Sequence, residues 1–575
     1  YKVATMKEIV TIQVGGFSNF IGSHFWNFQD ELLGLAEDGH QDSIFKNTGL
    51  NMDILYRVGE TYQGTPTYTP RLFAIDSRGS LGAVSASGSL YEETSFSDAL
   101  SVPTWDGSIV RYVSEPNDKN EFLQSLEEEK DGTDNGSMKA GASYSENGTK
   151  DRARIECLEN GVQYWTDYSK VQFHPLSLYE IQGLWKDITP FNNFGNGRGI
   201  LTENSQAEVL SDRLRFFVEE CDHIQGFQFL VDDSGGFASV AADFVESVAD
   251  EYARTPILMY TARDPSSYSK LHDLRSLMTR ALHDAISFVK ISSFSGLTVP
   301  VGLPSLAKSQ ASQFLCIDDS KLFHSSAVYA STFHTATLPF RMEASRPSDI
   351  TEVGLGSLDM GMMIRTLSHQ YRQQVVASLD AAVPAPPVAG VRNRGVLERS
   401  LHSLTPNVAD NSTDTQGAET LVIQGALHSG RGGQAFISEV RDSIFPKHEG
   451  HARRLPDCHL SVSRCPLPIP LPFPCIFGNF IGQNGEILPS PSAEHLDVLS
   501  IPIATRLRSS KAILPFLENR LQNLQNWGIA SGSPGGQLLE TWGLQKADVE
   551  DLGESLSEMV LSFDDSLRNS SSDSD

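Results

Sequence analysis

The chain has 575 residues, of which 39% are hydrophobic and 20% are charged, and its formal net charge is −27. This length and composition predict two to four mostly globular domains. The acidic balance, with no basic stripe, excludes a generic nucleic-acid binder, which needs cations to displace counterions. Six sparse cysteines favour reduced thiols in a cytosolic setting over a disulfide framework. No signal peptide precedes the first expected strand, although the natural N-terminus can lie upstream of Tyr1.

The first expected elements, within residues 1–126, are a strand, a turn and a helix. Residues 7–27 read KEIVTIQVGGFSNFIGSHFWN, in which an apolar run from Glu8 to Val14 meets a glycine pair and then an amphipathic stretch rich in aromatic residues. A second strand is expected at 71–77, RLFAIDS. Residues 127–150 are polar, glycine-rich and without periodicity, which predicts a flexible insertion.

Residues 151–345 predict a parallel α/β sheet. Apolar positions recur with helical spacing over 209–221, and a buried strand is expected at 223–232. The turn DSGGFAS leads into a helical face over 240–252, and ILMYT after Pro256 is another strand. This order of helix, strand, turn, helix and strand is typical of a parallel sheet.

The remainder of the chain predicts a divergent α+β region. Residues 346–419 are expected to hold a helix from Gly361 to Ala382 and a Pro/Ala-rich linker. Residues 420–530 are expected to form a second folded region that ends in a helix near 512–527. From Glu540 onward there are ten acidic residues against two basic ones, so 531–575 is predicted to be a disordered acidic tail.

No stretch of the sequence is typical of a transmembrane helix. The long apolar run near the C-terminal end contains CPLPIPLPFPC, with proline at every second position from Pro466 to Pro474. Proline at this spacing forbids a helix and predicts extended or polyproline-like backbone. Any membrane association is therefore expected to be peripheral or to run through a partner.

Two glycine turns are the candidate ligand-binding loops: GGFSN (15–19) and DSGGFAS (233–239). Open parallel sheets bind ligands beyond the carboxyl ends of their strands, and helix N-termini attract anions through unpaired amides. The candidate nucleotide-binding residues are Gly15, Gly16, Ser18, Asn19, Gly235, Gly236 and Ser239. The alternative is that both are tight turns without a ligand. Asp232 and Asp233 could hold magnesium, or could cap the helix that follows them.

Other motifs give no catalytic or metal site. The sequence has no Gly-Lys dipeptide and therefore no Walker A loop, and GNGRG (195–199) is interpreted as a loop. The segment KHEGHARRLPDCHL (447–460) is rich in histidine, but HEGH is one residue shorter than H-E-x-x-H and the cysteine spacing does not suit a zinc knuckle. We therefore nominate no metal ligand and no catalytic residue.

Three segments in the same order resemble tubulins. EIVTIQVGGFSNFIGSHFWN is similar to the tubulin N-terminus, in which an E-I-V strand leads into G-Q-C-G-N-Q-I-G. YTPRLFAIDSRGS (68–80) is similar to the strand and loop that approach the metal of the nucleotide. ECDHIQGFQFLVDDSGGFAS (220–239) is similar to the strand that leads into G-G-G-T-G-S-G. LFHSSAVYASTFHTATLPFRM (322–342) resembles a later tubulin helix and strand more faintly. The resemblance implies a tubulin-like α/β fold, a Rossmann-type parallel sheet with flanking helices.

The departures from tubulin fall in the nucleotide-binding parts. Gly16 and Phe17 replace the Gln and Cys that contact nucleotide, and Phe237 stands where the signature glycines and threonine continue. Arg78 replaces the acidic residue of the metal-proximal loop, and RMEASRPSDI (341–350) has no counterpart of the N-x-D catalytic loop. These changes imply an architecture without the chemistry of a GTPase.

Together with YWTDYSKVQFHPLSLYEIQG (164–183), these features resemble the misato family, tubulin-related proteins of the mitochondrial outer membrane and cytoplasm. The resemblance implies a non-enzymatic protein that acts in mitochondrial distribution, morphology and inheritance through protein contacts. It implies no cofactor, and partners that are tubulin-related or mitochondrial-surface proteins. The alternatives are a GTP-binding switch or weak GTPase, and a polymer subunit, which the insertion and the missing catalytic loop disfavour.

Overall fold

The structure is a computed structural model of the chain. The structure describes residues 7–37, 43–46, 48–60, 66–84, 118–134, 154–202, 205–268, 273–343, 356–368, 375–388, 394–408, 417–428, 433–445, 458–492, 497–530 and 532–563.

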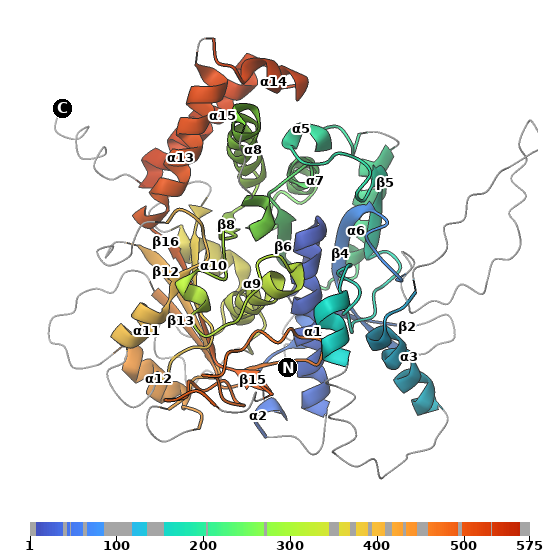
Figure 1. Ribbon diagram of the computed structural model, residues 1–575, viewed down its shortest axis with the longest axis vertical. Coiled ribbons are helices and arrows are strands. Elements are labelled where there is room, and N and C mark those ends of the chain that lie inside the picture. The colour runs from blue at the N-terminus through green and yellow to red at the C-terminus, as the bar shows by residue number, and fades with distance from the viewer. Residues whose placement is uncertain are drawn as a thin grey trace, which may run out of the picture.

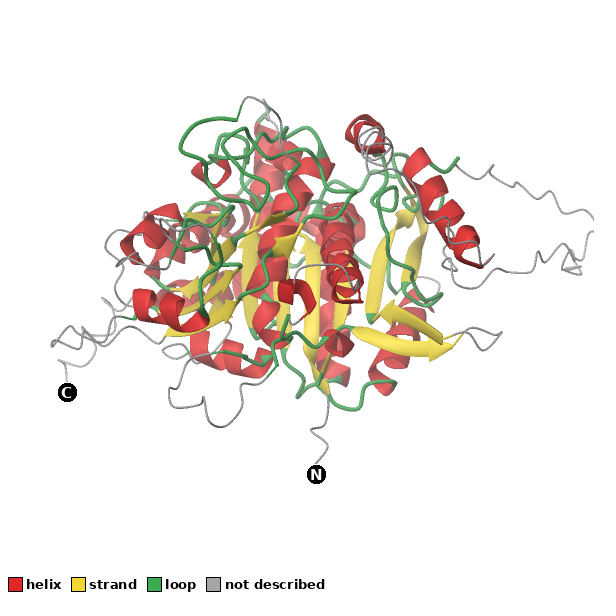
Figure 2. Cartoon of the chain, turned by 90° about the horizontal axis from the view of Figure 1, so that it is seen from below, coloured by secondary structure: helices red, strands yellow, loops and turns green. Residues whose placement is uncertain are grey.

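A seven-stranded parallel sheet lies at the centre, in the order β5-β4-β1-β6-β7-β8-β9 (Figures 1 and 2). Its strands are β1 (Glu8–Val14), β4 (Leu72–Arg78), β5 (Leu178–Trp185), β6 (Ile224–Asp232), β7 (Ile257–Ala262), β8 (Leu297–Val301) and β9 (Val375–Val376). All seven residues of β1 are buried, as expected for a strand covered on both faces. The prediction of a parallel α/β sheet is confirmed.

Helices cover both faces of this sheet. On one face lie α1 (Gly16–Glu37) and α9 (Leu322–Ala336), which share a core with Ile9 of β1. On the other face lie α6 (Gln206–Glu219) and α7 (Phe237–Glu251), whose core includes the alternate β1 residues Val10, Ile12 and Val14. Because β1 and β6 end side by side, with Val14 opposite Val231, both glycine turns lie at the carboxyl edge of the sheet.

Several short elements surround this sheet. They are α2 (Ser43–Lys46), the hairpin of β2 (Tyr56–Glu60) and β3 (Pro66–Pro70), α3 (Glu121–Asp134) and α5 (Phe194–Gly197), with 3-10 turns at Met52–Ile54, Pro265–Tyr268, Gln310–Ser312 and Leu338–Phe340. Helix α3 runs through the first residues of the predicted insertion 127–150, so that boundary was wrong. The rest of the insertion lies outside the described residues.

A second, five-stranded sheet has the order β11-β10-β16-β12-β13. Its strands are β11 (His402–Ser403), β10 (Ser378–Ala382), β16 (Ile503–Ser509), β12 (Ala418–Gln424) and β13 (Cys458–Ser463), and α10 (Met360–Leu367), α11 (Arg394–Ser400) and α12 (Ile437–Ile444) lie beside it. The predicted helix Gly361–Ala382 was wrong at β9 and β10, and the predicted linker was wrong at the end of β10, at α11 and at β11. Ala381 and Ala382 are small enough to fill a buried strand, whereas alanine and proline content alone suggested a linker.

The proline-rich stretch is extended at Leu467–Pro468, as predicted, but residues 471–473 form a turn, in which the amide of Phe473 donates to the carbonyl of Pro470 at 3.1 Å. Its strand β14 (Leu467–Pro468) pairs with β15 (Ser500–Ile501). Further along, Phe473 lies 5.7 Å from the ring of His24 and 5.8 Å from the ring of Phe28, both on α1. The stretch is therefore a buried strap across α1.

The C-terminal helices correct the largest sequence-based error. Helices α13 (Leu514–Leu524), α14 (Gly536–Thr541) and α15 (Lys546–Phe563), with a 3-10 turn at Lys511–Ile513 and a π-helical turn at Gln525–Ile529, pack with α8 (Leu274–Ser292) (Figure 1). The disordered tail predicted for 531–575 was wrong at α14 and α15. Leu552, Leu556 and Phe563 are buried at helical spacing while the acidic residues face outward, so the net charge concealed an amphipathic helix. None of the helices in the described ranges has the length and apolar character needed to cross a bilayer.

Candidate functional site

The first glycine turn connects β1 to α1 at a point of close chain approach. Gly15 has φ +105°, and a Cβ atom there would lie 2.5 Å from Oδ2 of Asp232. Only glycine combines this backbone conformation with that clearance. Gly16 is the first residue of α1, and a Cβ atom there would meet nothing within 4 Å. The close approach that Gly15 permits is thus to a carboxylate of the same chain.

That carboxylate occupies the N-terminus of α1. Asp232, the last residue of β6, accepts hydrogen bonds from the amide of Phe17 (3.0 Å), the amide of Ser18 (2.6 Å) and the hydroxyl of Ser18 (2.7 Å). Carboxylates at this position satisfy unpaired amides and complement the helix dipole, as a bound phosphate does. The suggestion that Asp232 caps the following helix was therefore wrong, because it caps α1 across the sheet.

A second buried carboxylate lies beside the first. Asn19 donates to Oδ2 of Asp76 at 2.9 Å, and the indole nitrogen of Trp165 donates to the same oxygen at 3.1 Å. Burial raises the pKa of Asp232 to about 7 against the hydrogen bonds from Ser18 and Phe17, and the charge of Asp76 adds to the rise. Burial also raises the pKa of Asp76, although the hydrogen bond from Asn19 opposes it. An added phosphate here would meet negative charge at short range.

The second glycine turn, before α7, is covered by the chain's own backbone. The amide of Gly236 donates to the carbonyl of Phe191 at 3.0 Å. A Cβ atom on Gly235 would lie 2.5 Å from that carbonyl oxygen, and one on Gly236 would lie 2.5 Å from the ring of Phe191. Phe237, which stands where the tubulin signature glycines and threonine continue, packs edge-on against Phe191, with the ring centroids 4.9 Å apart. These glycines make room for the segment 191–197.

The segment 191–197 contains most of GNGRG, which was interpreted as a loop. Its residues Phe194–Gly197 form the short helix α5. A Cβ atom on Gly197 would lie 1.9 Å from the carbonyl oxygen of Gly236. Trp542 packs against this segment. Its carbonyl accepts a hydrogen bond from Arg198 at 3.0 Å, and its ring lies against Gly195. The C-terminal helices therefore help to cover the second glycine turn.

Asp233 has a separate role. It binds Arg263 at 2.6 Å, and Arg263 also binds Asp284 at 2.8 Å, so this carboxylate is held in a buried ion-pair network. Asp232 and Asp233 thus do not converge on one point. Among the described residues, no group of three His, Cys, Asp or Glu side chains could hold a metal ion. His448 and His451 lie outside the described residues.

Two other predicted departures have defined positions. The guanidinium of Arg78 lies 4.5 Å above the ring of Trp185, at the ends of neighbouring strands. Arg341 is buried in the core, where it donates to Gln29 and to the carbonyl of His334, and residues 344–350 lie outside the described residues.

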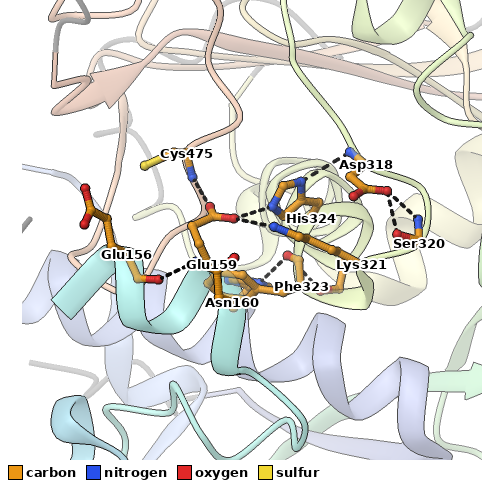
Figure 3. A network of polar contacts seen from close by, with 11 residues as sticks. Glu156, Glu159, Asn160, Asp318, Ser320, Lys321, Phe323, His324 and Cys475 are labelled. Carbon is orange, nitrogen blue, oxygen red and sulfur yellow. Dashed lines mark hydrogen bonds and ion pairs between the residues drawn. The ribbon is translucent and has the colours of Figure 1, made fainter. Parts of the chain in front are cut away.

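A polar cluster away from the glycine turns was not foreseen (Figure 3). Glu159, in the helical residues 154–161, accepts from His324 at 2.7 Å, from Lys321 at 3.2 Å and from the amide of Cys475 at 2.7 Å. Burial would raise the pKa of Glu159, but these hydrogen bonds and the neighbouring positive charge lower it to about 2. The Cys475 thiol points away from His324 in Figure 3, so the cluster ties three segments together rather than forming a nucleophile–base pair.

The predicted residues do converge, but around internal groups. Gly15, Ser18 and Asn19 gather at Asp232 and Asp76, while Gly235 and Gly236 meet Phe191. As arranged, these turns do not fit a triphosphate, because the amides of Phe17, Ser18 and Gly236 already have acceptors. Ser239 Oγ and Asn19 Oδ1 are buried without a hydrogen-bond partner. The sequence feature that indicates internal occupation of these turns is Asp232, because an acidic residue directly before a glycine turn repels phosphate.

Comparison with known proteins identifies relatives along most of the chain. Residues 7–128 match the Misato Segment II tubulin-like domain, and residues 156–342 match a Tubulin domain. Protein misato homolog 1 of Mus musculus is 30% identical over 542 residues, covering 88% of this chain and 89% of that protein. Protein misato homolog 1 of Danio rerio is 29% identical over 621 residues, covering 99% of each chain. Protein DML1 of Gibberella zeae is 30% identical over 345 residues, covering 59% of this chain and 61% of that protein.

Proposed function

This chain belongs to the misato family of tubulin-like proteins, and we propose that it is a non-enzymatic scaffold that regulates mitochondrial distribution, morphology and inheritance through protein contacts. The observation that carries the non-enzymatic part is the carboxylate of Asp232 on the amides of Phe17 and Ser18. An internal carboxylate supplies the charge that a nucleotide phosphate supplies in a helix N-terminal site. The fold then keeps its shape without nucleotide.

The mitochondrial role rests on the family resemblance. In this proposal the protein works in the cytoplasm and peripherally on the mitochondrial outer membrane, with tubulin-related or mitochondrial-surface proteins as partners. Depleting the protein from cells should alter mitochondrial morphology, and wild-type protein and the Ser18→Ala variant should restore it equally. Ser18→Ala removes one hydrogen bond to Asp232 but leaves both amides on it. Failure of wild-type protein to restore morphology would contradict the mitochondrial role.

The nucleotide part has its own test on the purified full chain. Thermal unfolding with GTP and magnesium at millimolar concentration should show no saturable stabilisation, because any ligand that binds only the native state raises its stability. Phosphate release should not exceed that of a blank without protein. A saturable shift or a tubulin-like turnover by wild-type protein would contradict the proposal.

A GTP-binding switch is the second candidate. It is favoured by Ser239 Oγ and Asn19 Oδ1, which are buried without partners at the two turns. Buried polar atoms usually have a partner, so an added ligand could satisfy them if Asp232 turned away. Calorimetric titration separates the candidates: heat on adding GTP that disappears in Asn19→Ala supports the switch, and no heat supports the scaffold.

A further inference from the structure

A cavity of about 420 Å³ lies at the amino ends of β7 and β8, the opposite edge of the sheet from the glycine turns. It is bounded by the last turns of α7 and α8 and by α10, which comes from a distant part of the sequence. Its volume is within the range of small-molecule sites. Neither the tubulin resemblance nor the proposed scaffold function uses this edge.

The charge of the cavity is opposite to that of the protein. Arg254 and Arg365 line it, and none of its lining residues is acidic, although the whole chain has 72 acidic residues against 45 basic ones. The acidic Asp359 lies beside Arg365, but Asp359 is already paired with Lys7 at 3.0 Å. The carbonyl ends of α7 and α8 contribute about half a negative charge each, which two guanidinium groups exceed. The cavity therefore favours an anion.

The other lining groups narrow the class of ligand. Tyr252, Phe294 and Ile364 give apolar walls, and Thr255 adds a hydroxyl. The hydroxyl of Ser295 also lies in the lining but is already bonded to the carbonyl of Ser292 and to Thr298. A phosphate monoester has a charge of about −1.5 to −2 at neutral pH and three acceptor oxygens, which suits two guanidinium groups better than a single carboxylate does. An apolar or sugar portion attached to the phosphate would contact the ring walls.

We propose that this cavity binds a phosphate-bearing ligand, with Arg254 and Arg365 as its phosphate-binding residues. The phosphate belongs either to a soluble phosphate ester or to the headgroup of an anionic phospholipid. Met362, which is 44% exposed, follows Gly361 of the lining on α10 and would lie near a lipid surface in the second case.

The test uses the full chain and two probes. Glycerol 3-phosphate is titrated calorimetrically, and sedimentation is measured with phosphatidylcholine vesicles that contain or lack phosphatidic acid. Arg254→Gln with Arg365→Gln should weaken binding at least about tenfold, since the phosphate loses the charge-assisted hydrogen bonds of two guanidinium groups. Arg275→Gln is the matched control, because Arg275 is exposed at the other end of α8 and should bind like wild type.

Binding of glycerol 3-phosphate identifies a soluble ester, and binding only to phosphatidic acid vesicles identifies a headgroup. Either result supports the proposal if the double variant loses it and Arg275→Gln keeps it. Binding of neither probe, or equal binding by the double variant, overturns it. These outcomes do not depend on GTP or on mitochondrial morphology, so the scaffold proposal is tested separately.

Discussion

Replacing Asp232 with alanine should change stability in a way that depends on pH. In the unfolded chain an aspartate titrates near 4, whereas burial raises the pKa of Asp232 to about 7 in the folded protein. The folded state therefore binds the proton more tightly, and the stability that Asp232 contributes falls as the pH rises from about 4 to about 7. Between pH 5 and pH 8 this loss is about 2.5 kcal/mol, from the two titration curves.

At pH 5 the carboxyl is mostly protonated, and its removal costs the hydrogen bonds to Phe17 and Ser18. Leaving buried amides without an acceptor costs about 1–3 kcal/mol. We therefore expect Asp232→Ala to lower the free energy of unfolding by about 3 kcal/mol at pH 5. The deficit should shrink to under about 1 kcal/mol at pH 8, because wild type then has an ionised carboxylate buried near Asp76.

Urea unfolding at both pH values measures the deficit. Asp273→Ala is the matched control, because Asp273 caps α8 through the amide of Ser276 at 2.8 Å but is exposed, and that hydrogen bond lowers its pKa. Its deficit should be the same at pH 5 and pH 8. Sulfate should then stabilise Asp232→Ala more than wild type, because the variant exposes the amides of α1 to an anion.

Two results would refute this reasoning. One is a deficit for Asp232→Ala that does not change between pH 5 and pH 8, which would mean that burial does not raise the pKa of Asp232 to near 7. The other is equal stabilisation of variant and wild type by sulfate, compared at matched ionic strength. That result would mean that the N-terminus of α1 does not accept an anion.

Three further predictions follow from single contacts. Gly15→Ala should reduce soluble yield or lower the melting temperature sharply, since its Cβ would lie 2.5 Å from Asp232. Gly16→Ala should have little effect, because a Cβ there meets nothing within 4 Å. Equal melting temperatures of the two variants would contradict the close approach of Gly15 to Asp232. Glu159→Gln should cost about 1–2 kcal/mol of unfolding free energy at pH 7, with allowance for partial solvent screening. Because the pKa of Glu159 is lowered to about 2, this cost should fade as the pH drops from about 4.5 to about 2. A cost that does not change with pH would exclude the ion pairs of Glu159. Leu556→Ala should lower the free energy of unfolding by about 2–4 kcal/mol in denaturant unfolding, because Leu556 is fully buried. Glu554→Ala should change it almost not at all, because Glu554 is exposed. Equal effects would mean that α15 is not packed on α8 and α13.

Local sequence patterns located the central sheet and its turns. The apolar run from Glu8 to Val14 became β1 with the same bounds, and the helical spacing over 209–221 became α6 (Gln206–Glu219). Both patterns depend on residues close in sequence, so the chain alone contains the signal. The wrong predictions for the C-terminal part rested on composition. The acidic residues of α15 suggested disorder and the alanines of β10 suggested a linker, because neither composition shows the distant segments that bury these elements.

The sequence by itself determined the strand–turn–helix framework, its tubulin resemblance and the residues that gather at the carboxyl edge of the sheet. Only the tertiary structure decided what those residues contact. Asp232 lies 214 positions from Ser18, and Phe191 reaches Gly236 from a separate loop. A hydrogen bond between distant residues leaves no periodic trace in the sequence, because it depends on strands β1 and β6 ending side by side. Whether the turns meet a phosphate or an internal carboxylate is therefore decided by the pairing of two strands.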